Sequence, residues 1–344
     1  MGPILVTGGA GYIGSVVGQT LLERGHSIIV LDSLEEGHRE AVSEKAVFFR
    51  GNIGDEALLT RIFGSYPVSA VIHLAAFCQV GESVQDPEKY YLNNVVNGLT
   101  LLKMMRSFGV RKMVFSSTAA VYGEPLALPI TETHPKQPIN PYGQSKLIFE
   151  QILEGYAQAY GLKYCAFRYF NAAGASEFFG EDHSPESHLI PLVLRVPLKK
   201  ARPSKESERE PGSLKVFGRD YPTPDGSCVR DYIHIQDLAL AHCQALERLD
   251  TLPQRIFNLG SGRGFSVLEV IETARRVTGM GIPFQVVGRR PGDPAVLVAS
   301  SDRARAVLNW APAFPDLEAI VTSAWKWMQR FPGGYGDRLD SYIS

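Results

Sequence analysis

The chain has few cysteines, and they stand far apart. Its 344 residues include four, Cys78, Cys165, Cys228 and Cys243, with no Cys-x-x-Cys pair among them. This number and spacing argue against a disulfide framework and against a cysteine-ligated zinc site. The sequence therefore favours a reducing compartment.

An excess of charge of one sign and long apolar runs are also lacking. The 35 basic and 36 acidic residues leave a formal net charge of −1, so no overall positive field would attract nucleic acid or a membrane surface. No apolar run approaches the roughly 18 residues of a transmembrane helix, and no charged-then-apolar leader precedes the first predicted strand. We expect a cytoplasmic protein that binds neither nucleic acid nor a membrane.

Histidine occurs eight times, without a pattern that indicates a metal site. There is no His-x-x-x-His spacing, and no carboxylate cluster suggests a metal site. His73 ends a predicted strand and His234 precedes a predicted helix, so we interpret both as structural residues. No metal ligand is predicted.

The glycine-rich segment Thr7–Gly14 is the strongest signal that is present. It follows the apolar stretch Ile4–Val6 and contains Gly9-x-Gly11-x-x-Gly14, after which a helical pattern begins. A strand that turns through glycines into a helix binds a pyrophosphate at the helix N-terminus. Asp32 ends the next predicted strand, where its carboxylate can accept from a ribose 2′-hydroxyl and would repel a 2′-phosphate. The pattern therefore predicts NAD rather than NADP.

Apolar strand-like runs alternate with helical patterns through the first half of the chain. This alternation predicts an α/β fold, a Rossmann-type doubly wound parallel sheet with ligands at the carboxyl ends of its strands. The predicted strands are 3–7, 27–32, 46–50, 70–74, 111–117 and 163–168, and the predicted helices are near 12–24, 56–65, 88–108 and 142–160.

The chain changes character after about residue 175. Glu177–Glu186 and Pro197–Ser213 read as charged connectors, and Pro191, Pro197 and Pro203 argue against long regular elements there. We therefore predict a smaller, irregular α/β lobe that binds the substrate. The expected division is 1–175 for the NAD-binding domain, with a return segment near 228–260, and 176–344 for the second lobe.

A second chemical signal lies in Tyr142-Gly143-Gln144-Ser145-Lys146. Tyr142 and Lys146 are four residues apart and share one face of the predicted helix. A nearby ammonium stabilises a phenolate, so Lys146 would lower the pKa of Tyr142 and make it a usable base. The strand 111–117 ends in hydroxyl residues, and Thr118 at its tip could hold the substrate oxygen that Tyr142 deprotonates.

The glycine pattern, the Ser-Ser-Thr strand end and the Tyr-x-x-x-Lys pair together resemble the extended short-chain dehydrogenase/reductase family over nearly the whole chain. Further segments are similar to the members of that family that epimerise UDP-sugars at carbon 4. These segments are Val80–Ser83, Arg168–Asn171, Phe217–Gly226, Val229–His234 and Arg289–Asp293.

The resemblance implies reversible epimerisation at carbon 4 of a UDP-hexose, UDP-glucose or UDP-galactose, through a transient 4-keto intermediate with tightly bound NAD as the hydride store. It implies Tyr142, Lys146 and Thr118 as the catalytic residues. The implied cofactor-binding residues are Gly8, Gly11, Tyr12, Ile13, Gly14, Asp32, Asn52, Ile53, Leu74, Ala75, Ala76, Asn94, Ser116, Tyr142, Lys146 and Tyr169.

The UDP-sugar would be held mainly by its nucleotide end, because the keto sugar must turn over inside the site. By resemblance, Arg230 and Arg290 pair with the diphosphate, Phe217 touches the uracil ring and Asp293 holds the uridine ribose. The implied substrate-binding residues are Thr118, Asn171, His188, Leu189, Phe217, Arg230, Arg290, Asp293 and Leu297. The helices near 88–108 and 142–160 pair across a two-fold axis in the relatives, so a homodimer is expected.

Two residues depart from the pattern of the family, and a third leaves the choice of UDP-sugar open. Asn52 stands where many relatives carry aspartate, and Cys78 stands where some carry a lysine. Leu297 is a medium-sized residue at the position that limits room for the sugar, so 4-epimerases of UDP-N-acetylhexosamine, UDP-glucuronate or a UDP-pentose stay possible.

A dehydratase would need an acid or base after Thr118, where Ala119 and Ala120 stand. A non-catalytic NAD-binding protein would not need the intact catalytic residues.

Overall fold

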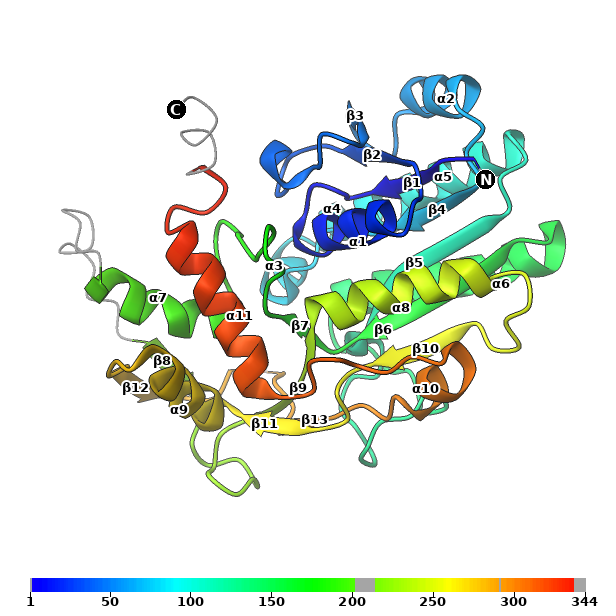
Figure 1. Ribbon diagram of the computed structural model, residues 1–344. Coiled ribbons are helices and arrows are strands. Elements are labelled where there is room, and N and C mark those ends of the chain that lie inside the picture. The colour runs from blue at the N-terminus through cyan, green and yellow to red at the C-terminus, as the bar shows by residue number, and fades with distance from the viewer. Residues whose placement is uncertain (1, 202–213, 291, 337–344) are drawn as a thin grey trace, which may run out of the picture.

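The computed structural model describes residues 2–201, 214–290 and 292–336. Figure 1 shows a twisted sheet with helices on both faces and, beside it, a smaller lobe built from later parts of the chain. Among the described residues, none of the helices is both long and apolar enough to cross a membrane.

The main sheet contains seven parallel strands in the order β10-β6-β5-β4-β1-β2-β3. The six strands predicted in the first half are all present, with ends within one residue of the prediction. The Rossmann-type fold is thereby confirmed. The strands are β1 Ile4–Thr7, β2 Ile28–Asp32, β3 Val47–Arg50, β4 Ala70–His73, β5 Lys112–Thr118, β6 Lys163–Tyr169 and β10 Ile256–Leu259.

Alternating side chains of each strand enter two separate cores, because successive residues of a strand point to opposite faces. Ile4 and Val6 pack with Val17 in one core, whereas Leu5 packs with Leu59 in the other. Both faces of the sheet are therefore buried, as the apolar runs predicted. The helices over the first face are α1 Tyr12–Glu23 and α8 Ile235–Arg248, and those over the second are α2 Glu56–Ser65, α5 Asn97–Ser107 and α6 Pro141–Tyr160.

The smaller lobe contains two further sheets, in the orders β11-β9-β13 and β12-β8, with β7 paired to β9. Trp325 and Trp327 of this part are buried, and Trp310 is buried against α8, where its ring nitrogen donates to the Asp237 carbonyl at 2.8 Å. Its elements are β7 Asn171–Ala173, α7 Leu189–Ala201, β8 Leu214–Phe217, β9 Val229–His234, β11 Gly264–Ser266, α9 Val267–Thr278, β12 Phe284–Val287, β13 Val296–Leu297 and α11 Leu317–Arg330. Helix α10 Asp302–Leu308 packs instead against β10 and α8 at the edge of the main sheet.

The helix predicted over 88–108 is divided in the structure. It consists of α4 Pro87–Tyr91, the π-helical turn η2 Leu92–Val96 and α5, and an unpredicted helix, α3 Val80–Gln85, precedes it. The Asp86 carboxylate caps α4 by accepting from the Lys89 backbone N–H at 3.2 Å, which fixes the new start. The single-turn helices η1 Arg39–Ala41 and η3 Ala119–Val121 complete the described elements.

The prediction that prolines prevent a long element after residue 186 is wrong. Helix α7 runs through both Pro191 and Pro197. Pro191 lies in the first turn, where its missing N–H has no intrahelical partner to lose. Pro197 is interior, and its burial together with Ile190 and Leu194 offsets the cost of the lost hydrogen bond. Pro203 and the rest of the predicted connector beyond Ala201 lie outside the described residues.

The order of the strands in the main sheet indicates where a ligand would bind. The chain runs from β1 outward to β2 and β3 in one direction, and from β4 outward to β5 and β6 in the other. In open parallel sheets, ligands bind at the carboxyl ends of the strands where the order reverses. Thr7 and His73 are paired neighbours at this point, and their side chains are hydrogen-bonded at 2.8 Å.

Candidate active site

A cavity of about 1780 Å³ lies at this edge, between the main sheet and the smaller lobe. Pockets for one drug-sized ligand measure roughly 300–1,000 Å³, so this cavity has room for two nucleotide-sized molecules. With the exception of Asn94, every residue that the sequence analysis placed at a cofactor or substrate site contributes to its lining.

The glycine turn at the start of α1 permits a close approach that side chains would block. Gly8 has φ +72°, and a Cβ on it would lie 2.5 Å from the Ala75 backbone nitrogen. A Cβ on Gly14 would lie 2.1 Å from the Gly8 carbonyl oxygen. Gly11 caps α1 without a side-chain hydrogen bond, and the first residues of the helix line the cavity. These features fit the pyrophosphate of a dinucleotide.

Asp32 is held in place at the end of β2. Its two carboxylate oxygens accept from the backbone N–H groups of Ala10 and Leu34, each at 2.9 Å. Burial raises the pKa of this carboxyl, and the two backbone hydrogen bonds and nearby His38 oppose that rise. Asn52 is likewise fixed, because its side-chain oxygen accepts from the Gly54 backbone at 2.8 Å. Both side chains could receive donors of an adenosine.

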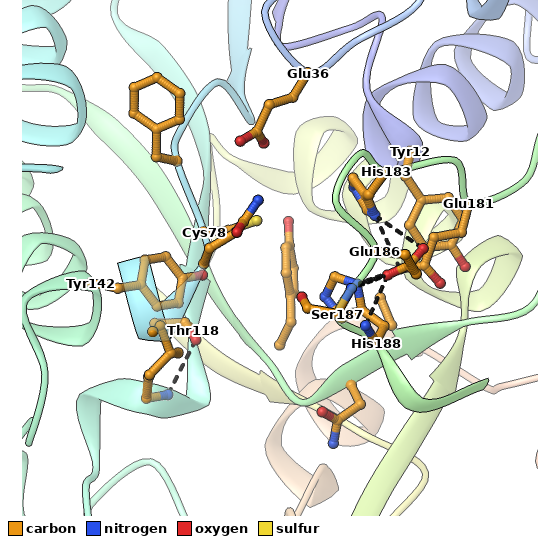
Figure 2. A pocket seen from close by; sticks show the side chains of 18 of the residues that line it. Tyr12, Glu36, Cys78, Thr118, Tyr142, Glu181, His183, Glu186, Ser187 and His188 are labelled. Carbon is orange, nitrogen blue, oxygen red and sulfur yellow. Dashed lines mark hydrogen bonds and ion pairs between the residues drawn. The ribbon is translucent and has the colours of Figure 1, made fainter. Parts of the chain in front are cut away.

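Tyr142, Thr118 and Lys146 meet at the carboxyl end of β5. Tyr142 and Lys146 lie in the first turns of α6, where Asn140 caps the helix through the Gly143 N–H at 2.8 Å. The Thr118 side chain is hydrogen-bonded to Tyr142, and the Lys146 ammonium donates to the Ser116 carbonyl at 2.7 Å. Figure 2 shows Tyr142 and Thr118 together on one side of the cavity.

The sequence analysis expects Lys146 to lower the pKa of Tyr142, and the structure differs from this expectation. Burial raises the pKa of Tyr142, which the Thr118 hydrogen bond only partly opposes, so the phenol is protonated at neutral pH. Lys146 is buried, and burial lowers its pKa to about 8. The ammonium is therefore charged at neutral pH, but its contact is the Ser116 carbonyl. Burial of the phenol, and not Lys146, dominates the pKa of Tyr142 in the protein alone.

The other end of the cavity is cationic and aromatic. The Arg230 guanidinium forms an ion pair with Asp293, and the Arg290 guanidinium lies 4.5 Å from the centre of the Phe217 ring. The amide nitrogen of Asn171 donates to the Asp231 carbonyl at 2.9 Å. Guanidinium groups bind phosphates through paired hydrogen bonds, so this end could hold a diphosphate beside a base.

The structure does not place Asn94 at the cavity. Its side chain is 3% exposed and bonds the Phe77 backbone N–H and carbonyl, each at 3.0 Å, and Ser145 at 3.1 Å. The amide is thus used to fasten the π-helical turn against α6 and the loop after β4. Its neighbour Asn93 lines the cavity instead. A sequence pattern places the helix but does not determine which of two adjacent amides faces a ligand once a π turn rotates them.

The sequence analysis also missed a group of four side chains opposite Tyr142. The charged segment after β7 folds back, so that Glu181, His183, Glu186 and His188 gather with their ligand-type atoms within 4.8 Å of one another. Figure 2 shows them across the cavity from Tyr142 and Thr118. The sequence analysis does not single out these four residues, and the structure brings them together. The spacing Glu-x-His-x-x-Glu-x-His was visible in the sequence, but a search for His-x-x-x-His does not find it.

The two histidines that were interpreted as structural have that role. The His73 ring nitrogen is bonded to Thr7, and burial lowers the pKa of His73 to about 3. His234 caps α8 by accepting from the Gln236 N–H at 3.2 Å.

Comparison with known proteins agrees with this geometry. A profile of the NAD dependent epimerase/dehydratase family matches residues 4–260. The chain belongs to this family. Its cofactor is therefore NAD, and the glycine turn, Asp32 and the uncapped start of α1 fit that group.

Related proteins cover almost the whole chain. The UDP-glucose 4-epimerase of Halalkalibacterium halodurans is 52% identical over 335 residues, which span 96% of this chain and 97% of that protein. A crystal structure of a UDP-glucose 4-epimerase has a TM-score of 0.91 at 46% identity and covers 97% of this chain and 99% of that one. The UDP-glucose 4-epimerase of Bifidobacterium longum, in complex with NAD+ and UDP, has a TM-score of 0.88 at 37% identity, with 96% and 99% covered.

Proposed function

We propose that the chain catalyses the reversible epimerisation of a UDP-hexose at carbon 4, interconverting UDP-glucose and UDP-galactose with NAD retained between turnovers. One observation carries this proposal. Tyr142, Thr118 and Lys146 face a single cavity that has a dinucleotide-type glycine turn at one end and the pair Arg230 and Arg290 at the other. The similarity to UDP-glucose 4-epimerases over nearly the whole chain supports it.

The catalytic residues act on the 4-hydroxyl of the sugar. Tyr142 takes the hydroxyl proton as a general base and later returns it, and Thr118 holds the same oxygen through its hydroxyl. NAD, held by the glycine turn Gly8–Gly14 and Asp32, would supply a reversible hydride acceptor for carbon 4. The positive charge of Lys146 favours the phenolate of Tyr142 against the burial that raises its pKa. The resulting 4-keto sugar turns over in the cavity, so that carbon 4 is reduced on its other face.

The nucleotide end supplies the binding energy. Arg230 and Arg290 pair with the diphosphate, Phe217 contacts the uracil and Asp293 the uridine ribose, and Asn171, His188 and Leu189 complete the lining. We propose residues 1–175 and the return segment 228–260 as the NAD-binding domain. Residues 176–344 otherwise form the UDP-sugar lobe. The segment 228–260 contributes β10 to the main sheet and α8 to the helices that cover it.

The first test uses UDP-galactose and the purified chain without added NAD, with UDP-glucose quantified by chromatography. Conversion would support both the epimerisation and the retained cofactor. If no UDP-glucose forms even with NAD supplied, the UDP-hexose assignment is wrong. UDP-N-acetylglucosamine, UDP-glucuronate and UDP-xylose are then assayed in the same way. Half-buried Leu297 in β13, which lines the cavity, is the residue expected to limit the larger 2-substituents.

We also propose a homodimer. Leu92, Val96 and Leu99 follow one another at spacings of four and three residues on the η2–α5 run and are 50%, 48% and 36% exposed. In many assemblies an exposed apolar stripe of this kind is buried against another subunit. We expect it to pack against the same face of a second copy of this chain. Sedimentation velocity of Val96→Glu should then show monomers, whereas Val286→Glu, on the 47% exposed Val286 of the other lobe, should sediment like the unmodified chain. Monomeric unmodified protein would contradict the proposal.

The cellular setting is proposed from the same activity. The four cysteines are free thiols in the structure, which suits a cytoplasmic enzyme, and UDP-galactose interconversion belongs to galactose metabolism. Fractionation of the source cells followed by the conversion assay tests this placement. Activity confined to an extracytoplasmic fraction would contradict it.

A further inference from the structure

The loop between β7 and α7 builds a compact group of nitrogen and oxygen ligands on the wall of the cavity. Glu181, His183, Glu186 and His188 lie within eight consecutive positions, and the dashed lines in Figure 2 mark the contacts that join them. Two imidazoles and two carboxylates are a donor set that suits Zn²⁺ and related divalent ions.

Four of the distances among these atoms are close to those of a tetrahedral site, and the whole set lies within 4.8 Å. The Nδ1 atom of His188 lies 2.8 Å from Glu181 Oε1 and 3.0 Å from Glu186 Oε1. The Nδ1 atom of His183 lies 3.3 Å from Glu181 Oε1 and 3.9 Å from Glu186 Oε2. Ligand atoms 2.0–2.1 Å from a tetrahedral zinc ion are about 3.3 Å apart. The four observed separations bracket this value, so small side-chain rotations would complete the site.

The burial of this group also indicates that a binding partner is missing. The side chains of Glu186 and Glu181 are 0% and 6% exposed. Within the described part of the chain, Glu186 Oε2 is buried and has no hydrogen-bond partner, and His183 Nδ1 has only the ion-pair contact with Glu181 at 3.3 Å. A buried polar atom without a partner costs about 1–3 kcal/mol. These two atoms face one another at 3.9 Å, and a cation between them would satisfy both.

The surrounding backbone orients the ligands. The N–H groups of Ser187 and His188 both donate to Glu186 Oε1 at 2.8 Å, which sets the direction of that carboxylate. Asp182 holds the same loop to other parts of the chain. Its carboxylate accepts from the Tyr335 backbone N–H at 2.9 Å, and its backbone carbonyl contacts the His38 ring at 3.0 Å. Outer contacts of this kind fix the geometry of first-shell metal ligands.

We propose that Glu181, His183, Glu186 and His188 bind one divalent transition-metal ion of the Zn²⁺ type. Four protein ligands close the coordination shell, which is the arrangement of structural rather than catalytic zinc sites. The ion would connect the loop to the start of α7. It would lie near Tyr12, whose ring centre is 6.3 Å from that of His183. Because His188 would bind through Nδ1, its Nε2 stays available to the cavity.

The test titrates Zn²⁺ alone into the full chain after treatment with a chelator and dialysis, by isothermal calorimetry. We expect one ion per chain. His183→Gln and Glu186→Gln should each weaken binding more than about 100-fold, because even outer-shell losses cost roughly 10- to 100-fold. His26→Gln removes a histidine outside the group and should bind Zn²⁺ like the unmodified chain. No binding, or equal binding by all four proteins, would overturn the proposal.

A second measurement covers the case in which a substituted chain fails to fold, as judged by circular dichroism. X-ray absorption of the unmodified chain with one equivalent of Zn²⁺ should show two imidazole nitrogens and carboxylate oxygens at about 2.0–2.1 Å. Ligation by sulfur would place the ion on a cysteine, and ligation by oxygen alone would indicate an adventitious ion only. Either result would refute the assignment. Thermal unfolding should also shift upward with Zn²⁺ in the unmodified chain and in His26→Gln, and not in Glu186→Gln.

Discussion

Helix α6 carries two glutamate–arginine pairs that differ mainly in burial. Glu150 receives two hydrogen bonds from the Arg168 guanidinium, at 2.9 and 2.6 Å, and the two side chains are 3% and 2% exposed. Glu154, one turn later, receives two from Arg255, at 3.0 and 2.9 Å, and these side chains are 43% and 44% exposed. Each carboxylate also has uncharged donors: Glu150 accepts from the Ser117 hydroxyl at 2.5 Å, and Glu154 accepts from the Tyr164 hydroxyl at 2.9 Å and from the Gln158 amide at 3.0 Å. The two pairs therefore compare a buried and an exposed carboxylate that both have an arginine and further donors.

We predict that Glu150→Gln destabilises the fold far more than Glu154→Gln does. The first change leaves the Arg168 guanidinium buried without a counter-charge. Losing one partner of a buried pair costs about 3–5 kcal/mol, whereas exposed pairs contribute about 0–1 kcal/mol. An amide oxygen still accepts one of the two hydrogen bonds, and Arg168 keeps its bond to the Tyr122 hydroxyl at 2.8 Å. We therefore expect about 3 kcal/mol for Glu150→Gln and less than about 1 kcal/mol for Glu154→Gln.

Urea denaturation followed by far-ultraviolet circular dichroism measures the difference. With a denaturant slope of roughly 3 kcal/mol per molar for a chain of this size, the midpoint should fall by about 1 M for Glu150→Gln and by about 0.3 M or less for Glu154→Gln. The slopes must agree among the three proteins for the comparison to hold. Equal shifts for the two variants would refute the argument that burial decides the cost.

Further predictions concern the site and its pH dependence. Tyr142→Phe should lower the conversion of UDP-galactose by roughly 10²- to 10⁴-fold while bound NAD is retained; activity within tenfold of the unmodified chain would remove Tyr142 from its role. Asp32→Ala should weaken NAD binding by roughly 10- to 100-fold and relax the discrimination against NADP, as measured by fluorescence titration, and an unchanged NAD affinity would contradict the ribose contact. Burial lowers the pKa values of His73, His234 and His242 to about 3, 4 and 4, below the value of about 6.5 expected in the unfolded chain. Their contribution is complete above about pH 6.5 and is lost as the pH falls toward the folded-state values. The free energy of unfolding from urea denaturation should therefore fall between about pH 6 and 4.5, by up to roughly 1.4 kcal/mol per pH unit for each histidine. A flat profile over that range would contradict this prediction.

The first half of the fold could be predicted because its signals are local. Buried parallel strands read as short apolar runs, and the helices between them repeat with their own period, so six strands were located to within one residue. The errors occurred where tertiary contacts outweigh local preference. Burial of Pro197 retains it inside α7, and the contacts of Asn94 with Phe77 accompany the π turn that divides the helix predicted over 88–108.

The sequence alone determined the chemistry that depends on residues close in the chain. The turn Gly8–Gly14 and Asp32 indicate a dinucleotide, and the spacing of Tyr142 and Lys146 on one helix indicates a proton-transfer pair, because each pattern needs one strand, one turn or one helix to take effect.

The tertiary structure decided which distant residues meet. The strand order brings Thr118 to Tyr142, and the smaller lobe brings Arg230 and Arg290 to the same cavity. The folding back of the loop after β7 turned Glu181–His188, which read as a charged connector, into a buried group of ligand atoms. Side-chain proximity of this kind follows from packing between elements, and no local spacing encodes it.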